Sequence, residues 1–239
     1  MVRAVTLDAA GTLFEVAEPV GATYARFAGR YGIDLVPAEV ERRFGEAFTA
    51  APPLAFAGGG PTRLPDHERA WWYAIVRRAF GAAATAPGFD ACFAALFAHF
   101  GHPAAWRVFP DVPPALGRLR AQGRRLAVVS NFDERLPALL AALGLRPLLD
   151  AVVPSSRAGA AKPDPAIFHA ALAALEVPNC EAVHAGDSII SDVEGARTAG
   201  MRAVLVDRRG RRPHLPPDTA VVTTLAELPS VVTHIDASR

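Results

Sequence analysis

The feature that most constrains the fold is a regular alternation of strand-like and helix-like segments over residues 107–207. Apolar runs predict strands at 126–130, 151–153, 182–185 and 203–206, and helical patterns predict helices at 113–121, 133–143, 165–175 and 191–199. Gly123, Gly144 and Gly200 stand where three of these helices would end. Repeated strand-helix units of this kind are typical of an α/β protein with a doubly wound parallel sheet.

A further apolar run at residues 2–7 predicts a buried strand that ends at Asp8. Ser130 and Asp187 also directly follow predicted strands or lie at their ends. Ligands in open parallel sheets bind at the carboxyl ends of the strands. We therefore expect Asp8, Ser130 and Asp187 to converge in space although they are far apart in the sequence.

Residues 15–106 have a different pattern, in which amphipathic helical segments recur and no strand is needed. Helices are predicted at 20–31, 38–50, 67–80 and 89–100, with a Pro/Gly-rich loop at 51–65. The pattern divides the chain into a core domain of residues 1–14 and 107–239 and an inserted helical domain of residues 15–106.

Composition restricts the partners of the chain. Lys and Arg number 25 against 24 Asp and Glu, so a net charge of +1 gives no reason to expect nucleic acid or a membrane, and a small molecule is the expected partner. No segment is long and apolar enough to span a bilayer, and the N-terminal apolar run is too short for a signal peptide. The cysteines, Cys92 and Cys180, lack metal-ligand spacing and are expected to be buried, which predicts a cytoplasmic location.

Four short motifs in a fixed order carry the chemical signal. They are Asp8-Ala9-Ala10-Gly11-Thr12-Leu13-Phe14, Ser130-Asn131, Lys162-Pro163-Asp164-Pro165 and Gly186-Asp187-Ser188-Ile189-Ile190-Ser191-Asp192. With this order and spacing, almost the whole chain resembles the haloacid dehalogenase-like hydrolase superfamily, in its helical-cap subgroup. The resemblance implies a three-layer Rossmann-like core and an inserted helical cap that closes over the active site and selects the substrate.

The residue types of these motifs suit phosphoryl transfer. A carboxylate such as Asp8 can attack phosphorus and form an aspartyl phosphate, which divides one slow hydrolysis into two faster steps. Lys162, the only lysine of the chain, supplies positive charge, and Ser130, Asn131 and the Thr12 region supply hydrogen-bond donors. We therefore predict Asp8, Lys162 and Ser130 as catalytic residues, and Thr12, Ser130, Asn131 and Lys162 as substrate-binding residues.

The same motifs predict a metal site. Asp8 and Asp187 form a hard oxygen site suited to Mg²⁺, which would relieve repulsion between a carboxylate and a phosphate. The resemblance adds the backbone carbonyl of Ala10 as a third protein ligand. Asp192 would support the site indirectly or through water, although an acid in the first turn of a helix is also favoured by the helix dipole.

Ala10 departs from the phosphatase pattern. In phosphatases of the superfamily, the residue two positions after the nucleophile is an acid that protonates the leaving oxygen and later activates water, and alanine can do neither. One interpretation is a phosphatase that acts on a good leaving group, such as an acyl phosphate, or takes a proton from water or a nearby acid. Asp133 is a candidate acid, although its position also suits a helix N-cap.

Two other interpretations stay open. Haloacid dehalogenases of the superfamily also lack the second acid, because halide leaves without a proton, but they are metal-free and carry a Ser-Asn type motif at Gly186-Asp187. The third interpretation is a protein that binds a phosphorylated ligand with little turnover. The presence of all four of Asp8, Lys162, Asp187 and Asp192 argues against it, because a protein without catalytic activity has no evident need for them. The sequence thus predicts a Mg²⁺-dependent phosphatase-type hydrolase (EC 3.1.3) of a small phosphorylated metabolite, without naming that metabolite or the oligomeric state.

Overall fold

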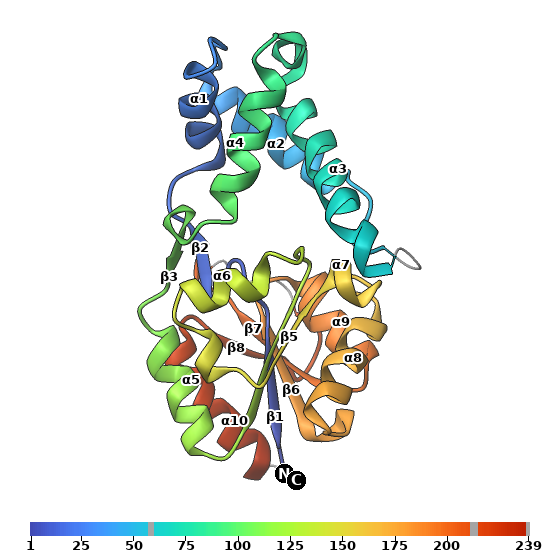
Figure 1. Ribbon diagram of the computed structural model, residues 1–239. Helices are drawn as coiled ribbons and strands as arrows, with labels where there is room; N and C mark the ends of the chain where they lie inside the picture. The colour runs from blue at the N-terminus through green and yellow to red at the C-terminus, as the bar shows by residue number, and fades with distance from the viewer. Residues whose placement is uncertain (57–59, 211–214, 238–239) are drawn as a thin grey trace. The chain divides into compact units, whose positions relative to one another are not determined.

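A computed structural model describes residues 1–56, 60–210 and 215–237 (Figure 1). The chain forms two compact units. The core unit comprises Met1–Glu15, Ala55–Gly58 and Val108–Arg239, and the helical unit comprises Val16–Leu54 and Gly59–Arg107. That the helical unit closes over a site and selects substrate stays a prediction.

The core unit contains a six-stranded sheet in the order β5-β4-β1-β6-β7-β8, and every pairing is parallel. Its strands are β1 (Ala4–Leu7), β4 (Arg125–Ser130), β5 (Ala151–Pro154), β6 (Ala182–Gly186), β7 (Arg202–Val206) and β8 (Ala220–Val222). All four residues of β1 are buried, as expected for a strand covered on both faces. Because β1 lies between β4 and β6, the chain segments that follow these three strands emerge side by side at one edge of the sheet.

Helices cover both faces of this sheet. They are α5 (Val112–Ala121), α6 (Leu136–Ala142), α7 (Ser155–Ala158), α8 (Pro165–Leu175), α9 (Gly195–Thr198) and α10 (Leu228–Ala237). Figure 1 shows α5 and α10 on the side of the sheet opposite to α8 and α9. The parallel sheet between two helical layers confirms the predicted α/β, three-layer Rossmann-like architecture.

The helical unit is built around aromatic side chains. Its elements are α1 (Val20–Gly29), α2 (Pro37–Thr49), α3 (Gly60–Phe80) and α4 (Phe89–Phe100), and short strands β2 (Phe14–Val16) and β3 (Trp106–Val108) pair where the chain enters and leaves it. The buried cluster includes Tyr24, Phe27, Phe80, Phe89 and Phe93. Tyr24 lies 6.1 Å from Phe80 between ring centroids, within the range of favourable aromatic pairs.

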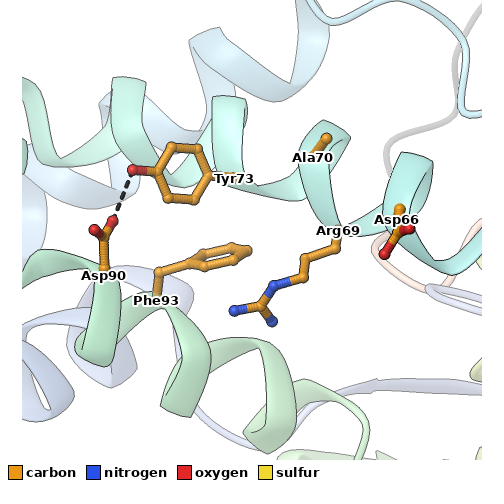
Figure 2. A pocket seen from close by; sticks show the side chains of 6 residues that line it. All are labelled: Asp66, Arg69, Ala70, Tyr73, Asp90 and Phe93. Carbon is orange, nitrogen blue, oxygen red and sulfur yellow. Dashed lines mark hydrogen bonds between the residues drawn. The ribbon is translucent and has the colours of Figure 1, made fainter.

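A shallow hollow of about 340 Å³ lies between α3 and α4 of this unit (Figure 2). The guanidinium of Arg69 lies 4.8 Å from the centroid of the Phe93 ring, a cation-π contact. Across the hollow, the Tyr73 hydroxyl donates to Asp90 Oδ1 at 2.7 Å. That bond raises the pKa of the tyrosine, so Tyr73 stays protonated and fixes the carboxylate.

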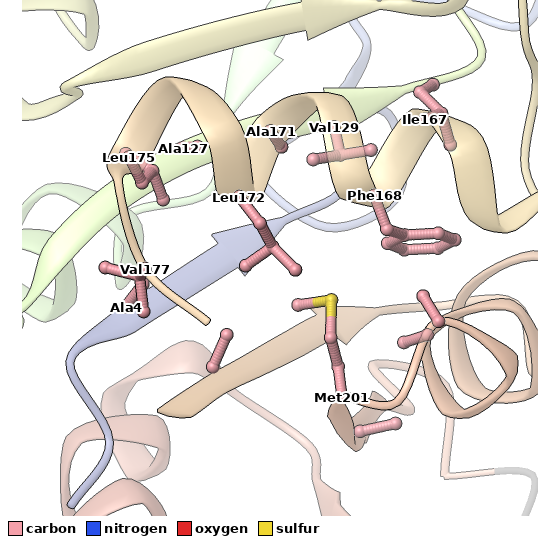
Figure 3. Packing of buried hydrophobic residues seen from close by; sticks show 14 of the residues in the cluster. Ala4, Ala127, Val129, Ile167, Phe168, Ala171, Leu172, Leu175, Val177 and Met201 are labelled. Carbon is pink, nitrogen blue, oxygen red and sulfur yellow. The ribbon is translucent and has the colours of Figure 1, made fainter. Parts of the chain in front are cut away.

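A cluster of buried hydrophobic side chains packs helix α8 against the sheet (Figure 3). Helix α8 buries Ile167, Phe168, Ala171, Leu172 and Leu175, which recur three and four residues apart and pack in one cluster with Ala4, Ala127 and Val129. Burying each large apolar side chain contributes about 1.5–3 kcal/mol. The Asp164 side chain accepts from the Ala166 N–H at 2.9 Å and caps the helix. Packing and cap together fix where α8 begins, and Lys162 lies three residues before that point.

Several local expectations were wrong. Helix α3 begins at Gly60 and has Pro65 inside it, so the loop expected at 51–65 is shorter; the helix continues past Pro65 although proline has no N–H to donate there. Strands β2 and β3 reach into the region expected to be wholly helical. Cys92 is buried but Cys180 is exposed, on the short 3-10 helix at Asn179–Glu181.

Two helix predictions needed smaller corrections. Helix α6 begins at Leu136 and not at Asp133, because the Asp133 carboxylate accepts the backbone N–H of Arg135 in the preceding turn. The helix expected at 191–199 is a π-helix at Ile189–Glu194 followed by α9. Other short 3-10 helices lie at Gly81–Thr85, Pro103–Ala105, Arg146–Leu148 and Leu225–Glu227. Among the described residues, no helix has the length and apolar character needed to cross a membrane.

Candidate active site

Asp8 lies at the carboxyl end of β1 and is 6% exposed. Its backbone N–H donates to Ala185 on β6, which fixes the residue at the strand edge. Lys162 Nζ lies 2.6 Å from Asp8 Oδ1, and Ser130 Oγ, at the end of β4, donates to the same oxygen at 3.2 Å. Burial raises the pKa of Asp8, and the nearby Lys162 ammonium opposes that rise without cancelling it.

Lys162 forms a second ion pair with Asp192, whose Oδ1 lies 2.6 Å from Nζ. Burial alone would lower the pKa of Lys162, but the Asp192 and Asp8 carboxylates raise it above its ordinary value. The lysine therefore stays charged between two acids. The Lys162 side chain is 3% exposed, so its contacts are shielded from water and are stronger than those of a surface pair.

Asn131 holds the backbone of Lys162. Its Nδ2 donates to the Lys162 carbonyl at 2.9 Å, and its Oδ1 accepts the Lys162 N–H at 2.7 Å. This pair of bonds joins the loop after β4 to the loop before α8, two segments far apart in the sequence. Asn131, predicted to bind substrate, thus has its amide side chain engaged in orienting the lysine.

Asp192 has hydrogen-bond partners on both oxygens. Besides Lys162, Oδ1 contacts His184 Nε2 at 3.0 Å, while Oδ2 accepts the Ser188 N–H at 2.9 Å. Burial raises the pKa of Asp192, but the Lys162 charge and the His184 hydrogen bond lower it well below its ordinary value. Asp192 is therefore ionised, and its carboxylate contacts Lys162 and His184 directly.

His184 is a site residue that the sequence reasoning missed. It lies on β6, fully buried, and its Nδ1 is 2.8 Å from Thr6 Oγ1 on β1. Burial lowers the pKa of His184, so the ring is neutral; with Asp192 ionised, Nε2 carries the proton and Nδ1 accepts from Thr6. A polar residue inside the otherwise apolar run at 182–185 was the signal available in the sequence.

Asp187 follows β6 and completes a cluster of three acids. One oxygen each of Asp8, Asp187 and Asp192 lie within 4.8 Å of one another. Burial and the charges of Asp8 and Asp192 raise the pKa of Asp187 to about 6. These three carboxylates face one lysine, so the group carries excess negative charge when all are ionised.

Two glycines permit this close arrangement. Gly11 has φ of +91°, and a β-carbon there would lie 2.6 Å from Asp187 Oδ2. At Gly186, a β-carbon would lie 2.2 Å from Asp192 Cγ. Any side chain at either position would displace an acid of the cluster.

The donor set fits a magnesium ion. Hard carboxylate oxygens are its preferred protein ligands, and a divalent cation offsets the excess negative charge of the cluster. Of the predicted ligands, Asp8, Asp187 and Asp192 are brought together by the fold. Ala10 lies in the turn after Asp8, where it forms an isolated bridge with Phe14, and its methyl group offers no acid.

The remaining predicted residues have other surroundings. The Thr12 side chain is fully buried, and its hydroxyl has no hydrogen-bond partner within the described part of the chain. Asp133, considered as a replacement acid, is fully buried and held by Arg135, whose Nη2 lies 2.6 Å from Asp133 Oδ2. The Asp133 carboxylate is thus engaged by the backbone and the guanidinium of Arg135.

Comparison with known proteins agrees with this geometry. The family model of haloacid dehalogenase-like hydrolases matches residues 2–200. A Danio rerio protein named haloacid dehalogenase-like hydrolase domain-containing protein 3 is 36% identical over 244 residues, which cover 98% of this chain and 97% of that protein. A phosphoserine phosphatase of Thermus thermophilus is 38% identical over 120 residues, which cover 50% of this chain and 48% of the relative.

Solved structures give the same assignment. A HAD phosphatase from Thermococcus onnurineus is similar with a TM-score of 0.67 and 26% identity, covering 97% of this chain and 98% of that one. A 2-haloacid dehalogenase from Pseudomonas syringae is similar with the same score and identity, covering 98% of this chain and 100% of that one. These matches confirm the resemblance inferred from the four motifs: the chain belongs to the haloacid dehalogenase-like hydrolase family.

Proposed function

We propose that the protein is a Mg²⁺-dependent phosphatase that hydrolyses a small phosphorylated metabolite through an aspartyl phosphate on Asp8. The observation that carries the proposal is the cluster of Asp8, Asp187 and Asp192, two of which pair with the buried Lys162. A metal-free dehalogenase has no evident use for three acids at one point. The phosphatase among the partial relatives and the phosphatase among the structural neighbours support the same activity.

In the proposed reaction, Asp8 attacks phosphorus. Lys162 and Ser130 both bind Oδ1, which orients the carboxylate and leaves Oδ2 as the attacking atom. An Asp8–phosphorus bond forms and the bond to the leaving oxygen breaks; water then attacks phosphorus, which releases phosphate and restores Asp8. The Lys162 ammonium offsets the negative charge of the phosphoryl oxygens.

Asp8, Asp187 and the Ala10 carbonyl would hold the ion, with Asp192 supporting the site through Lys162. When bound, Mg²⁺ supplies charge that offsets the repulsion between carboxylate and phosphate. Ala10 cannot protonate the leaving oxygen, so the proposed substrates are those whose leaving group departs as a stable anion, such as acyl phosphates. We also place the activity in the cytoplasm, in keeping with two cysteines that form no disulfide.

A 2-haloacid dehalogenase is the second candidate, favoured by two observations. The position two residues after Asp8 carries a methyl group, and displacement of halide needs no proton donor there. The Pseudomonas syringae dehalogenase is as similar in structure as the phosphatase. Asp187 weighs against this candidate, because it adds negative charge next to the site of an anionic haloacid.

The deciding experiment follows phosphate and halide release separately. Purified protein is assayed with Mg²⁺ on alkyl phosphates, aryl phosphates, acyl phosphates and 2-haloacids, with Asp8→Asn as the inactive control. We expect phosphate release that EDTA abolishes. Halide release that persists in EDTA would replace the proposal with the dehalogenase, and absence of both products would favour a ligand-binding protein.

A further inference from the structure

An arginine that the proposed chemistry does not use lies beside the loop after β1, residues 8–13, which we call the catalytic loop because it carries Asp8. Arg208 follows β7, and its Nη2 and Nε donate to the Thr12 carbonyl at 2.8 and 3.3 Å. Its Nη1 donates to both oxygens of Asp111 at 3.2 and 3.1 Å. The guanidinium also contacts the Phe109 ring, with its carbon 3.8 Å from the ring centroid. One side chain therefore joins three segments of the core unit.

Asp111 gives this arginine a fixed support. The residue directly precedes α5, and its Oδ2 also accepts from Thr224 Oγ1 at 2.7 Å and from the Leu225 N–H at 2.6 Å. Burial raises the pKa of Asp111, but these hydrogen bonds and the Arg208 charge lower it below its ordinary value, so the acid stays ionised. The Arg208 and Asp111 side chains are each 15% exposed, which limits screening of the pair by water.

The arginine holds backbone rather than a side chain. Thr12 offers its carbonyl to Arg208, and the next carbonyl, of Leu13, accepts the Phe109 N–H at 3.1 Å. Two successive carbonyls at the end of the catalytic loop are thus fixed from outside the loop. The buried Thr12 hydroxyl makes no hydrogen bond of its own within the described residues, so these carbonyl contacts anchor the segment.

The anchored residues adjoin the acidic cluster. Gly11 directly precedes Thr12, and its backbone lies so close to Asp187 that a β-carbon would be 2.6 Å from Oδ2. A shift of the Thr12 carbonyl would therefore change the spacing between the loop that carries Asp8 and the Asp187 carboxylate. We propose that Arg208 is a positioning residue that holds residues 8–13 against Asp187 and thereby sets the affinity of the acidic cluster for a divalent cation.

The test measures the loop and the metal affinity independently of turnover. In Arg208→Ala, amide hydrogen exchange at Gly11 and Leu13, whose N–H groups bond to Phe14 and Ala9, should become at least about tenfold faster. The Mg²⁺ dissociation constant, measured by calorimetry, should rise about tenfold, as for other groups that orient metal ligands. Arg208→Lys should behave like Arg208→Ala, because an ammonium cannot replace the flat, forked contacts to Thr12, Asp111 and Phe109.

Arg124→Ala is the matched control. Arg124 pairs with Asp236 at 2.6 Å, their side chains are 11% and 17% exposed, and the arginine also donates to a backbone carbonyl, that of Val2. This pair lies before β4, at the amino end of the sheet. Arg124→Ala should reduce stability and leave both the exchange of the loop amides and the Mg²⁺ affinity unchanged.

The outcomes separate the two proposals. Unchanged exchange at Gly11 and Leu13 in Arg208→Ala would overturn the positioning role, as would equal effects of the Arg124 control. The metal effect rests on the proposed function: if the unmodified protein binds no Mg²⁺, the proposed metal dependence fails, and faster loop exchange in Arg208→Ala alone would still support the positioning role. Faster exchange with unchanged Mg²⁺ affinity would refute the claim that Arg208 sets that affinity.

Discussion

At the scale of single residues, the site has contacts that orient the proposed nucleophile, Asp8, but has no acid two positions after it to protonate the leaving group. Asp8 has Lys162 and Ser130 on one oxygen, whereas Ala10 can neither donate nor accept a proton through its side chain. The proposed enzyme is therefore equipped to form the covalent intermediate and poorly equipped to expel a basic leaving group. Ala10→Asp tests the missing acid, and His184→Ala tests the contacts that orient the site.

Ala10→Asp should restore the missing acid. The Ala10 side chain is exposed, so an aspartate fits without displacing core atoms. The Ala10 carbonyl, the proposed main-chain ligand, is kept in the variant. We expect hydrolysis of alkyl phosphates to become at least about tenfold faster, the lower part of what a positioned general acid contributes, with a smaller gain on aryl phosphates. Initial rates on both series measure this. A folded variant that binds Mg²⁺ and gains on neither series would contradict the account.

His184→Ala should impair turnover by releasing Asp192. The change removes the bond from Nε2 and leaves a buried carboxylate with fewer donors, so Lys162 loses its fixed orientation. We expect kcat to fall about 10–100-fold, as for other groups that orient site residues, with little change in KM. His184→Gln, whose amide can bond both Asp192 and Thr6, should recover part of the loss.

His169→Ala supplies the control for this prediction. His169 lies on α8, and its Nε2 contacts a backbone carbonyl outside the site, that of Ala199, at 3.3 Å. Steady-state kinetics and thermal unfolding of the variants distinguish lost orientation from lost stability. Equal kcat in His184→Ala and the unmodified protein would remove His184 from the site.

At the scale of elements, residues from loops are held together by pairs of backbone contacts. Asn131 connects the end of β4 to the start of the Lys162 loop, Arg208 connects the segment after β7 to the loop after β1, and the Asp164 cap fixes α8. The strands fix the approximate positions of the site residues, and these polar contacts fix the orientation of their side chains. Loops built in this way can orient a charged side chain without being part of the sheet.

Asn131→Ala tests this role. It removes both hydrogen bonds to the Lys162 backbone and should lower stability by about 1–2 kcal/mol. Because Lys162 then loses its orientation, inorganic phosphate should inhibit about tenfold less strongly, in keeping with the effect of other supporting partners. Competitive inhibition and urea unfolding measure the two effects.

Asn179→Ala is the comparison for Asn131→Ala. Asn179 also uses its amide to bond backbone, at Ala199 and Cys180, but away from the site. It should lose stability without losing affinity for phosphate. Equal phosphate inhibition in both variants would show that Asn131 has no specific effect on Lys162.

The sequence predicted the strands better than the contacts between loops. Buried strands such as β1, β4 and β6 are visible in the sequence as apolar runs. Because parallel strands end at the same edge of a sheet, the convergence of Asp8, Ser130 and Asp187 could be predicted from them. Helix starts were harder, because Pro65 looks like a helix breaker and Asp133 like a cap. His184 and Arg208 were not predicted, because their contacts with Thr6 and with the Thr12 carbonyl join residues 178 and 196 positions apart in the chain.

At the scale of the whole molecule, repulsion among the carboxylates of the site lowers the stability of the fold. Three acids are gathered near one lysine at the carboxyl edge of the sheet, and the stability of the fold should therefore depend on pH and on divalent cations. The first dependence concerns Asp187, whose pKa is raised to about 6 from an ordinary value of 3.8. Between these two values the unfolded chain releases the proton more readily than the folded chain, so folding stability falls as pH rises from about 4 to about 6.

Asp187→Asn should remove this dependence. Without metal, the variant should be more stable than the unmodified protein above pH 6, by about 1–3 kcal/mol for a shift of roughly two pKa units at 1.36 kcal/mol each; the difference should vanish near pH 4, where Asp187 is protonated in both states. With Mg²⁺ present at 1,000 times its dissociation constant the order reverses, because the ion then stabilises the unmodified protein by about 4.1 kcal/mol and the variant gains little. Urea unfolding at pH 4.5 and 7.5, with Mg²⁺ and with EDTA, measures all four states. A variant that is less stable than the unmodified protein at pH 7.5 in EDTA would mean that Asp187 stabilises the fold without a cation, which the repulsion among these carboxylates does not allow.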